Sequence, residues 1–382
     1  MIGVTMHIRT AAVMVAAVLT IIGCSNESKP APAGQQDSRE AADTITEQQA
    51  VNNDSAEESG GYEVIATDLE SPWSIAPHEN VIYISEREGT IARVEGQELT
   101  REAVNVKQPV VQRGEGGLLG LELFPDFGET ARAYAYHTYE TEGELMNRIV
   151  VLERTEGQWN EVDVILEGIP GAMFHDGGRL KLGPDGYLYA TTGDAQQEEL
   201  AQQLESLAGK ILRMNRDGSV PEDNPFAGSL VYSYGHRNPQ GIAWSNDGNM
   251  YSMEHGPSGS PGGHDELNII QPGLNYGWPA IIGDETSEGM EQPLYHSGND
   301  TLAPSGMEVS NNGDILAAGL MSEQLVRFSP DGVLEEIVLD EVGRIRDVRF
   351  HNGQLYVITN NTDGRGNPGS EDDRLLRMEL EQ

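Results

Sequence analysis

A tight turn followed by a short apolar run recurs along this chain and constrains its fold more than any other feature. The apolar runs 187–190, 250–253 and 315–318 each follow a turn signal rich in Gly, Asp and Asn, and the run 355–358 follows the turn at 351–353. Asp-Gly and Asn-Gly pairs suit hairpin turns because both residues tolerate positive φ. The pattern predicts many short antiparallel strands.

The spacing of these units indicates a repeat architecture. Gly186, Gly248, Gly313 and Gly353 follow one another at intervals of 62, 65 and 40 residues. A loose period of this kind predicts an all-β fold, a six-bladed β-propeller of four-stranded antiparallel blades, at about 50 residues per blade. A pair of β-sandwiches is the alternative, and the repeated turn chemistry disfavours it. The best helical candidate is residues 198–212.

The charge balance and the cysteine count exclude several classes of protein. The chain has 24 Lys and Arg against 62 Asp and Glu, a formal net charge of −38. Such an acidic chain does not bind nucleic acid or an anionic membrane through bulk electrostatics. The single cysteine, Cys24, excludes an intrachain disulfide framework and a cysteine-based zinc site.

The first 60 residues read as an export signal and a tether. Apolar residues 10–22 are too short a run for a comfortable membrane span and end just before Cys24, which predicts a lipoprotein signal peptide over 1–23. An ordinary signal peptide or an uncleaved anchor is the alternative. Residues 24–60 are polar and acidic and predict a disordered tether, leaving 61–382 as the folded domain. We expect an exported protein, anchored to the outer face of a bacterial membrane through lipid on Cys24 alone.

The first candidate for chemistry is a histidine in a glycine-rich loop. His175 precedes Gly177 and Gly178, where the open backbone lets a ligand approach. Its imidazole can take a proton near neutral pH, and Asp194, at the end of the following strand, is placed to hold the ring. A loop histidine in a purely structural hydrogen bond is the alternative.

Two further segments carry arginines that suit an anionic or carbonyl ligand. Arg237 and Asn238, fixed by a following proline, offer a planar donor and an amide. Arg344 and Arg346 share one face if the segment is a strand, and they need an anionic partner. That partner is either local acids or an anionic ligand, and an arginine that only braces a turn remains the alternative for Arg237.

Oxygen-rich loops form the last candidate site. Segments 254–257, 262–268 and 275–279 combine Gly and Pro, which leave carbonyl oxygens unpaired, with nearby acids. Ca²⁺ accepts six to eight oxygen ligands of this kind, backbone carbonyls included. A solvated acidic loop is the alternative reading.

Taken together, nine segments resemble one family, the soluble quinoprotein sugar dehydrogenases of the glucose/sorbosone or aldose sugar dehydrogenase type. Those enzymes use pyrroloquinoline quinone (PQQ) and Ca²⁺ on a six-bladed propeller. The resemblance covers about residues 62–380. The segments that carry it are PWS at 72–74, GEGGLLG at 114–120, HDGGR at 175–179, LAGKILR at 207–213, GHRNPQG at 235–241, EHGP at 254–257, DELN at 265–268, NYGWP at 275–279 and RIRDV at 344–348.

The resemblance implies a catalytic pair and a cofactor site. His175 stands at the position of the base that takes the anomeric hydroxyl proton, and Asp194 at that of the acid that orients it. The implied cofactor contacts are Glu115, Arg237, Asn238, Arg344 and Arg346.

The resemblance also implies two Ca²⁺ ions. Gly256 and Pro257 would give carbonyl oxygens to the ion that polarises the quinone. Glu266 and Tyr276 match the positions of a second, structural ion, with Tyr276 acting through its carbonyl. The implied activity is oxidation of an aldose at the anomeric carbon to the lactone, with electrons passed to an external acceptor.

Two departures from the family pattern bear on the cofactor. Met321 or Ser322 stands where many relatives place a lysine on PQQ, and residues 258–261 with His264 lengthen the Ca²⁺ loop. These departures predict weaker PQQ binding or altered metal geometry. They also keep open two other functions: a non-redox propeller that binds a glycan or protein partner, and a Ca²⁺-dependent lactonase.

Overall fold

The computed structural model describes residues 61–257, 259 and 262–380. The predicted signal peptide and tether, residues 1–60, lie outside the described residues, as does most of the insertion at 258–261. Among the described residues, no helix is both long enough and apolar enough to cross a membrane. All of the described residues belong to one compact unit.

The described chain is all-β, which confirms the predicted fold class. Four sheets have four antiparallel strands each. In spatial order their strands are β10 (Leu180–Leu182), β11 (Leu188–Thr192), β12 (Lys210–Met214) and β13 (Val231–Tyr234); β14 (Pro239–Trp244), β15 (Met250–Glu254), β16 (Glu266–Ile270) and β17 (Tyr295–His296); β18 (Pro304–Val309), β19 (Ile315–Gly319), β20 (Leu325–Phe328) and β21 (Leu334–Leu339); and β22 (Ile345–His351), β23 (Gln354–Thr359), β24 (Leu375–Met378) and β1 (Tyr62–Ala66).

The remaining strands form one sheet of eight, in which two antiparallel halves meet. One half is β2 (Pro72–His78), β3 (Val81–Glu86), β4 (Thr90–Glu95) and β5 (Glu98–Asn105). The other is β6 (Leu118–Leu123), β7 (Arg132–Thr141), β8 (Glu144–Thr155) and β9 (Gln158–Pro170). The halves join through a parallel pairing of β5 with β9 at only two residue pairs. The short helix α1 (Phe127–Thr130) lies between β6 and β7.

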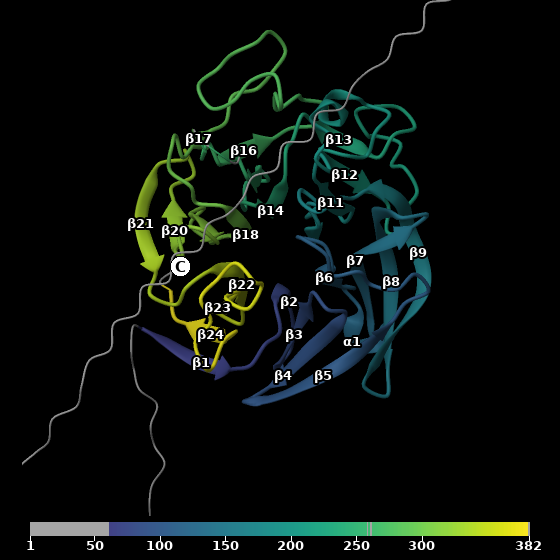
Figure 1. Ribbon diagram of the computed structural model, residues 1–382, viewed down its shortest axis with the longest axis vertical. Helices are drawn as coiled ribbons and strands as arrows, with labels where there is room; N and C mark the ends of the chain where they lie inside the picture. Colours follow the sequence, from purple (N-terminus) through teal and green to yellow (C-terminus); the bar gives the residue numbers. More distant parts are fainter. Residues whose placement is uncertain (1–60, 258, 260–261, 381–382) are drawn as a thin grey trace, which may run out of the picture. The chain divides into compact units, whose positions relative to one another are not determined.

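The sheets stand around a common centre with their first strands innermost (Figure 1). Strand β2 contacts both β6 and β22, β14 contacts β18, and β18 contacts β22. Glycine allows this close approach: a Cβ at Gly306 on β18 would lie 1.8 Å from Oδ1 of Asp347 on β22. Such a ring is typical of a β-propeller, and pairing of β1 with β24 joins the two ends of the folded domain.

The predicted turns all precede the second strand of a sheet. Gly186, Gly248 and Gly313 have φ between 83° and 92°, and each donates its N–H to the carbonyl three residues earlier. The strands that follow, β11, β15 and β19, are buried along their whole length because neighbouring sheets cover both faces. This burial explains why they are continuous apolar runs.

The predicted helix at 198–212 is wrong. Only Glu198–Gln202 forms a 3-10 helix, η1, and Lys210–Met214 is strand β12. The β12 segment is fully buried between β11 and β13, and tertiary pairing overrides its helical propensity.

Candidate active site

His175 lies in the loop between β9 and β10 and touches the acid predicted to hold it. Its Nδ1 is 2.7 Å from Oδ1 of Asp194, which follows β11 and is fully buried. A proton on Nδ1 shared with the carboxylate leaves Nε2 as the basic nitrogen. The predicted contact between these residues is therefore present.

The backbone of His175 is held in an uncommon conformation. Its φ is +68°, in the left-handed region. The N–H of His175 donates to Oε2 of Glu115 at 3.0 Å, and its carbonyl accepts from the N–H of Ala195 at 3.2 Å. A Cβ at Gly193 would lie 1.9 Å from that carbonyl oxygen, so glycine is required there.

Glu115 connects the histidine to the predicted cofactor contacts. Its Oε2 also accepts from Nδ2 of Asn238 at 3.2 Å, and its Oε1 from Nη1 of Arg365 at 3.1 Å. Burial raises the pKa of Glu115, but the charge that His255 carries when protonated in acid, the charge of Arg365 and the N–H of His175 outweigh burial and lower it to about 2. Glu115 is thus a carboxylate at neutral pH.

Arg344 and Arg346 face a carboxylate that the sequence analysis did not identify. Both approach Oδ2 of Asp363, at 3.1 Å and 3.8 Å, and all three side chains are buried. Arg344 precedes the first residue of β22, so the two arginines converge on Asp363 without both lying on the strand. A local acid therefore supplies one anionic partner.

The positive charge of the arginines in this region exceeds the negative charge of Asp363. Burial and the like charges of Arg87, Arg344 and Arg365 lower the pKa of Arg346 to about 9, against the attraction of Asp363. The Nε of Arg346 is buried and meets no hydrogen-bond partner in the described part of the chain. Four arginines surround only two carboxylates, Asp363 and Glu115. The excess positive charge would be balanced by a further anion.

A cavity of about 300 Å³ opens beside this cluster. Met321, 60% exposed, lies at its edge with its sulfur 3.7 Å from Nη1 of Arg344. Burial lowers the pKa of His255 to about 4, and its Nε2 is buried with no partner among the residues described. The cavity lining includes Glu115, His255, Gly256, Pro257, Asp265, Met321, Arg344 and Arg365.

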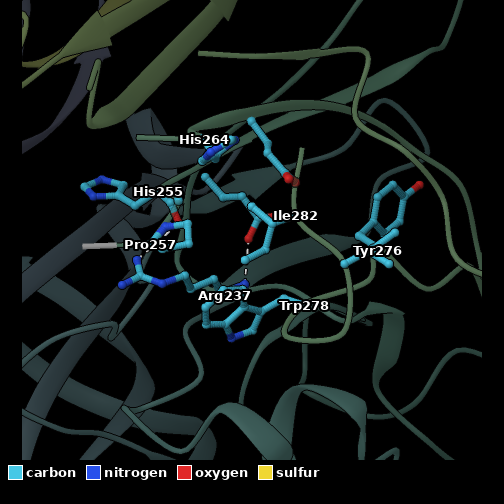
Figure 2. Close-up of a pocket in the computed structure, with 11 residues that line it drawn as sticks. Arg237, His255, Pro257, His264, Tyr276, Trp278 and Ile282 are labelled. Carbon is cyan, nitrogen blue, oxygen red and sulfur yellow. Dashed lines mark hydrogen bonds between the residues drawn. The ribbon is translucent and has the colours of Figure 1, made fainter. Parts of the chain in front are cut away.

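Arg237 lies beside the predicted metal loop and lines the same pocket as Gly256 and Pro257 (Figure 2). Its guanidinium donates to the carbonyl of His255 at 3.2 Å and lies over the ring of Trp278, 5.3 Å from the centroid. Asn238 accepts the N–H of Gly177 through Oδ1, which ties the Arg237 segment to the His175 loop. The structure thus brings together His175, Asp194, Glu115, Asn238 and, through the His255 loop, Arg237.

The predicted calcium residues Gly256, Pro257, Glu266 and Tyr276 all line one small pocket, which is drawn in Figure 2. Gly256 and Pro257 line the cavity of about 300 Å³, and the N–H of Gly256 donates to Asp265 at 2.9 Å. Glu266 pairs across the sheet with Glu254, while the ring of Tyr276 points away from Pro257 (Figure 2). Burial, together with the charge of Glu254, raises the pKa of Glu266 to about 8.

No group of three or more His, Cys, Asp or Glu side chains in the described residues has a metal-binding arrangement. A calcium site built largely from backbone carbonyls does not need one.

An open groove of about 740 Å³ is lined in part by residues of the His175 loop. Met173 and Ala195, close to His175 and Asp194 in the chain, contribute to its wall together with Arg113, Gln196 and Leu200. The segment that directly follows Asp194 in the chain therefore forms part of the groove wall.

Comparison with known proteins decides the family. The family model described as "Glucose / Sorbosone dehydrogenase" matches residues 69–377. The chain belongs to the glucose/sorbosone dehydrogenase family. The resemblance seen in the sequence is confirmed, and with it the assignment of this protein as an oxidoreductase.

Relatives of known name agree with this membership. An aldose sugar dehydrogenase of Escherichia coli is 31% identical over 79% of this chain and 90% of its own length. Quinoprotein glucose dehydrogenase B of Acinetobacter calcoaceticus is 32% identical over 67% of this chain and 59% of its own. The PQQ-bound aldose sugar dehydrogenase of Streptomyces coelicolor has a TM-score of 0.77 and 38% identity over 84% of this chain and 98% of that structure.

The structure adds residues that sequence reasoning missed. Arg87, Asp363 and Arg365 belong to the arginine cluster, and the indole of Trp278 donates to Asp194 at 2.8 Å. Arg365 stands between Gly364 and Gly366, a setting much like that of Arg237, and that likeness is the signal that could have found it. Trp278 was noticed only as part of a family segment.

Proposed function

We propose that this protein oxidises aldose sugars at the anomeric carbon to the lactone, with PQQ as its cofactor and Ca²⁺ as its metal, and passes the electrons to an external acceptor. The observation that carries the proposal is the His175–Asp194 pair together with a cluster of four arginines, of which Arg87, Arg344 and Arg346 are buried. The first is a base and the second is an anion site, and a quinoprotein sugar dehydrogenase needs both.

The cluster fits the acidic groups of PQQ. That cofactor carries three carboxylates, and planar guanidinium groups bind carboxylates with paired hydrogen bonds. Arg344 and Arg365 line the cavity, and Arg346 lies against the same Asp363. The neutral His255 offers an unpartnered Nε2 to a polar ligand. Arg237 and Asn238 would complete the contacts from the neighbouring loop.

The loops fit Ca²⁺ as the second component. Gly256 and Pro257 border the same cavity as Arg344, where their carbonyl oxygens would hold an ion against the cofactor. Near Tyr276, a cation would remove the cost of placing two buried carboxylates, Glu254 and Glu266, side by side. Both ions would be held by oxygen atoms alone, as a hard cation prefers.

His175 would act as the general base. Asp194 holds the proton on Nδ1, so Nε2 is the nitrogen that takes the proton of the anomeric hydroxyl. Bound PQQ would supply the ortho-quinone that accepts the hydride of the same carbon, two electrons in all. The groove lined by Met173 and Ala195 is large enough for a sugar to approach the His175 loop.

We also propose that the folded domain has six blades. The eight-stranded sheet separates into β2–β5 and β6–β9, because only Val104 and Asn105 of β5 pair with β9. If each half is one blade, the halves and the four other sheets would make six blades of four strands.

Dye reduction tests the function. The mature domain, about residues 60–382, would be assayed with a set of aldoses in the presence and absence of PQQ and of Ca²⁺. We expect reduction only when both are added. Reduction that needs neither, or lactone hydrolysis without PQQ, would refute the proposal.

A further inference from the structure

Both oxygens of the Asp194 carboxylate are held by named donors. Oδ1 lies 2.7 Å from Nδ1 of His175 and accepts the N–H of Gln196 at 2.8 Å. Oδ2 accepts the indole Nε1–H of Trp278 at 2.8 Å. Since Asp194 is fully buried, these donors take the place of water around its charge.

Trp278 is itself fixed from distant parts of the chain. Its N–H donates to the carbonyl of Gly235 at 2.9 Å, and its carbonyl accepts from Nε2 of Gln202 at 2.6 Å. Its ring lies against the guanidinium of Arg237, as Figure 2 shows. The indole N–H is therefore a preorganised donor whose direction is set by the loop after β13, η1 and the start of β14.

A carboxylate held at one oxygen only can rotate about its Cβ–Cγ bond. Rotation of Asp194 would weaken its contact with Nδ1 of His175 and would let the ring proton move to Nε2. A proton on Nε2 would abolish the base, since only an unprotonated nitrogen can accept the hydroxyl proton. The donor on Oδ2 prevents this rotation.

We propose that Trp278 is a positioning residue for the reaction, and that its indole N–H keeps Asp194 turned toward His175 and keeps the ring in the tautomer with Nε2 free. The inference rests on the proposed function and adds a third member to the His175–Asp194 pair.

The variant Trp278→Phe tests the proposal in the holoenzyme. Phenylalanine keeps an aromatic face for Arg237 and removes the N–H donor together with one ring of the indole. We expect kcat to fall about tenfold, the loss typical of a hydrogen bond to a charged group. We expect KM and the dissociation constant for PQQ to stay within twofold. A fall in kcat that follows loss of PQQ, or an unchanged kcat, would overturn the proposal.

The chain offers a matched control. Trp159 on β9 also donates its indole N–H to a buried carboxylate, Oε2 of Glu102, at 2.9 Å. Trp159→Phe removes the same kind of bond far from His175, so both variants should lose melting temperature while only Trp278→Phe loses turnover. Equal losses of kcat in the two variants would show that Trp278 acts through stability alone.

A second readout needs neither cofactor nor activity. Nitrogen-15 NMR of ring-labelled histidine in the protein without PQQ reports which ring nitrogen carries the proton, and His175→Ala assigns the signals. We expect the Nδ1–H tautomer in the original protein and a mixture in Trp278→Phe. The same tautomer in both would overturn the proposal, even if the dehydrogenase activity itself were absent.

If Trp278→Phe fails to fold, 3-benzothienylalanine at position 278 repeats both measurements with an isosteric ring that lacks the N–H.

Discussion

His175 combines an uncommon backbone conformation with a side chain held by a buried acid. A non-glycine residue at φ +68° costs about 1 kcal/mol, and such strain persists only where the surroundings enforce it. Here the enforcement comes from Glu115 on the N–H, Ala195 on the carbonyl and Asp194 on the ring. His175 is thereby held between Glu115, which lines the cavity beside the arginines, and Ala195, which lines the open groove.

His175→Ala should reduce turnover and leave the cofactor bound. Loss of a general base typically costs about 10² or more in kcat. Steady-state dye reduction and a PQQ titration measure the two effects separately. The control is His351→Ala, at the far end of the β22–β23 hairpin. Turnover unchanged from the control would refute the assignment of His175 as the base.

Arg365 should contribute to PQQ affinity. It lines the cavity beside Met321, where many relatives have a lysine, and its side chain is 38% exposed. We expect Arg365→Ala to weaken PQQ binding about tenfold, a modest effect because solvent screens the charge. Arg377→Ala is the matched control, since Arg377 is equally exposed and also paired with a glutamate, Glu63. Equal PQQ affinity in the two variants would contradict this role.

The buried carboxyl group of Asp176 is expected to make the stability of the protein depend on pH. Burial raises its pKa to about 7 from 3.8, against hydrogen bonds from Asn147 and Ala172. The folded state therefore holds a proton that the unfolded chain releases above pH 3.8. It follows that the free energy of unfolding falls as pH rises from about 4 to about 7 and levels off above that.

Asp176→Asn removes this titration and keeps an oxygen acceptor for Asn147 and Ala172. Chemical denaturation at several pH values should show Asp176→Asn gaining stability relative to the original protein between pH 4 and pH 7. A difference between the two that does not vary with pH would contradict the assignment.

At the scale of the elements, the turns and their second strands were predictable and the site was predictable only in part. Asp-Gly and Asn-Gly turns depend on local φ, so Gly186, Gly248 and Gly313 identify β11, β15 and β19 from sequence alone. The helix predicted at 198–212 was wrong because the secondary structure of its second half depends on pairing with β11 and β13. The local sequence does not encode that pairing.

The same distinction applies to the site residues. His175 and Arg237 stand in distinctive glycine-rich segments and were found. Asp363 was missed because it lies in the loop after β23 and meets Arg344 and Arg346 only once β23 has paired with β22. Trp278 was given no role because its partner, Asp194, is 84 residues away and only the ring of sheets brings them together. Contacts between blades are set by the closed fold, and a single sequence does not show them.

A substitution at Gly193, which directly follows β11, tests whether the end of that strand positions His175. A methyl group there would collide with the carbonyl of His175, so Gly193→Ala must displace the loop. We expect kcat to fall about 10², the cost of misplacing a catalytic group by about 1 Å. Gly353→Ala is the control, because its φ is +77° but nothing lies within 4 Å of the added Cβ. Full turnover in Gly193→Ala would contradict the positioning argument.

At the scale of the whole molecule, a strongly acidic chain surrounds a local site of the opposite sign. The formal net charge is −38, yet Arg87, Arg344, Arg346 and Arg365 influence one another inside the domain. Coulomb interactions are strongest at short range and in a medium of low dielectric constant, so the cluster dominates at the cavity. In the proposed function, the cluster attracts the anionic cofactor against the long-range negative field of the chain.

The central claim is that this site removes hydride from the anomeric carbon of a sugar. It is tested most directly by mixing the protein, reconstituted with PQQ and Ca²⁺, with an aldose deuterated at C1 and following cofactor reduction in a single turnover. We predict reduction several-fold slower than with the protiated sugar, and the lactone as product. Equal rates for the two sugars, or no reduction of bound PQQ, would contradict the account.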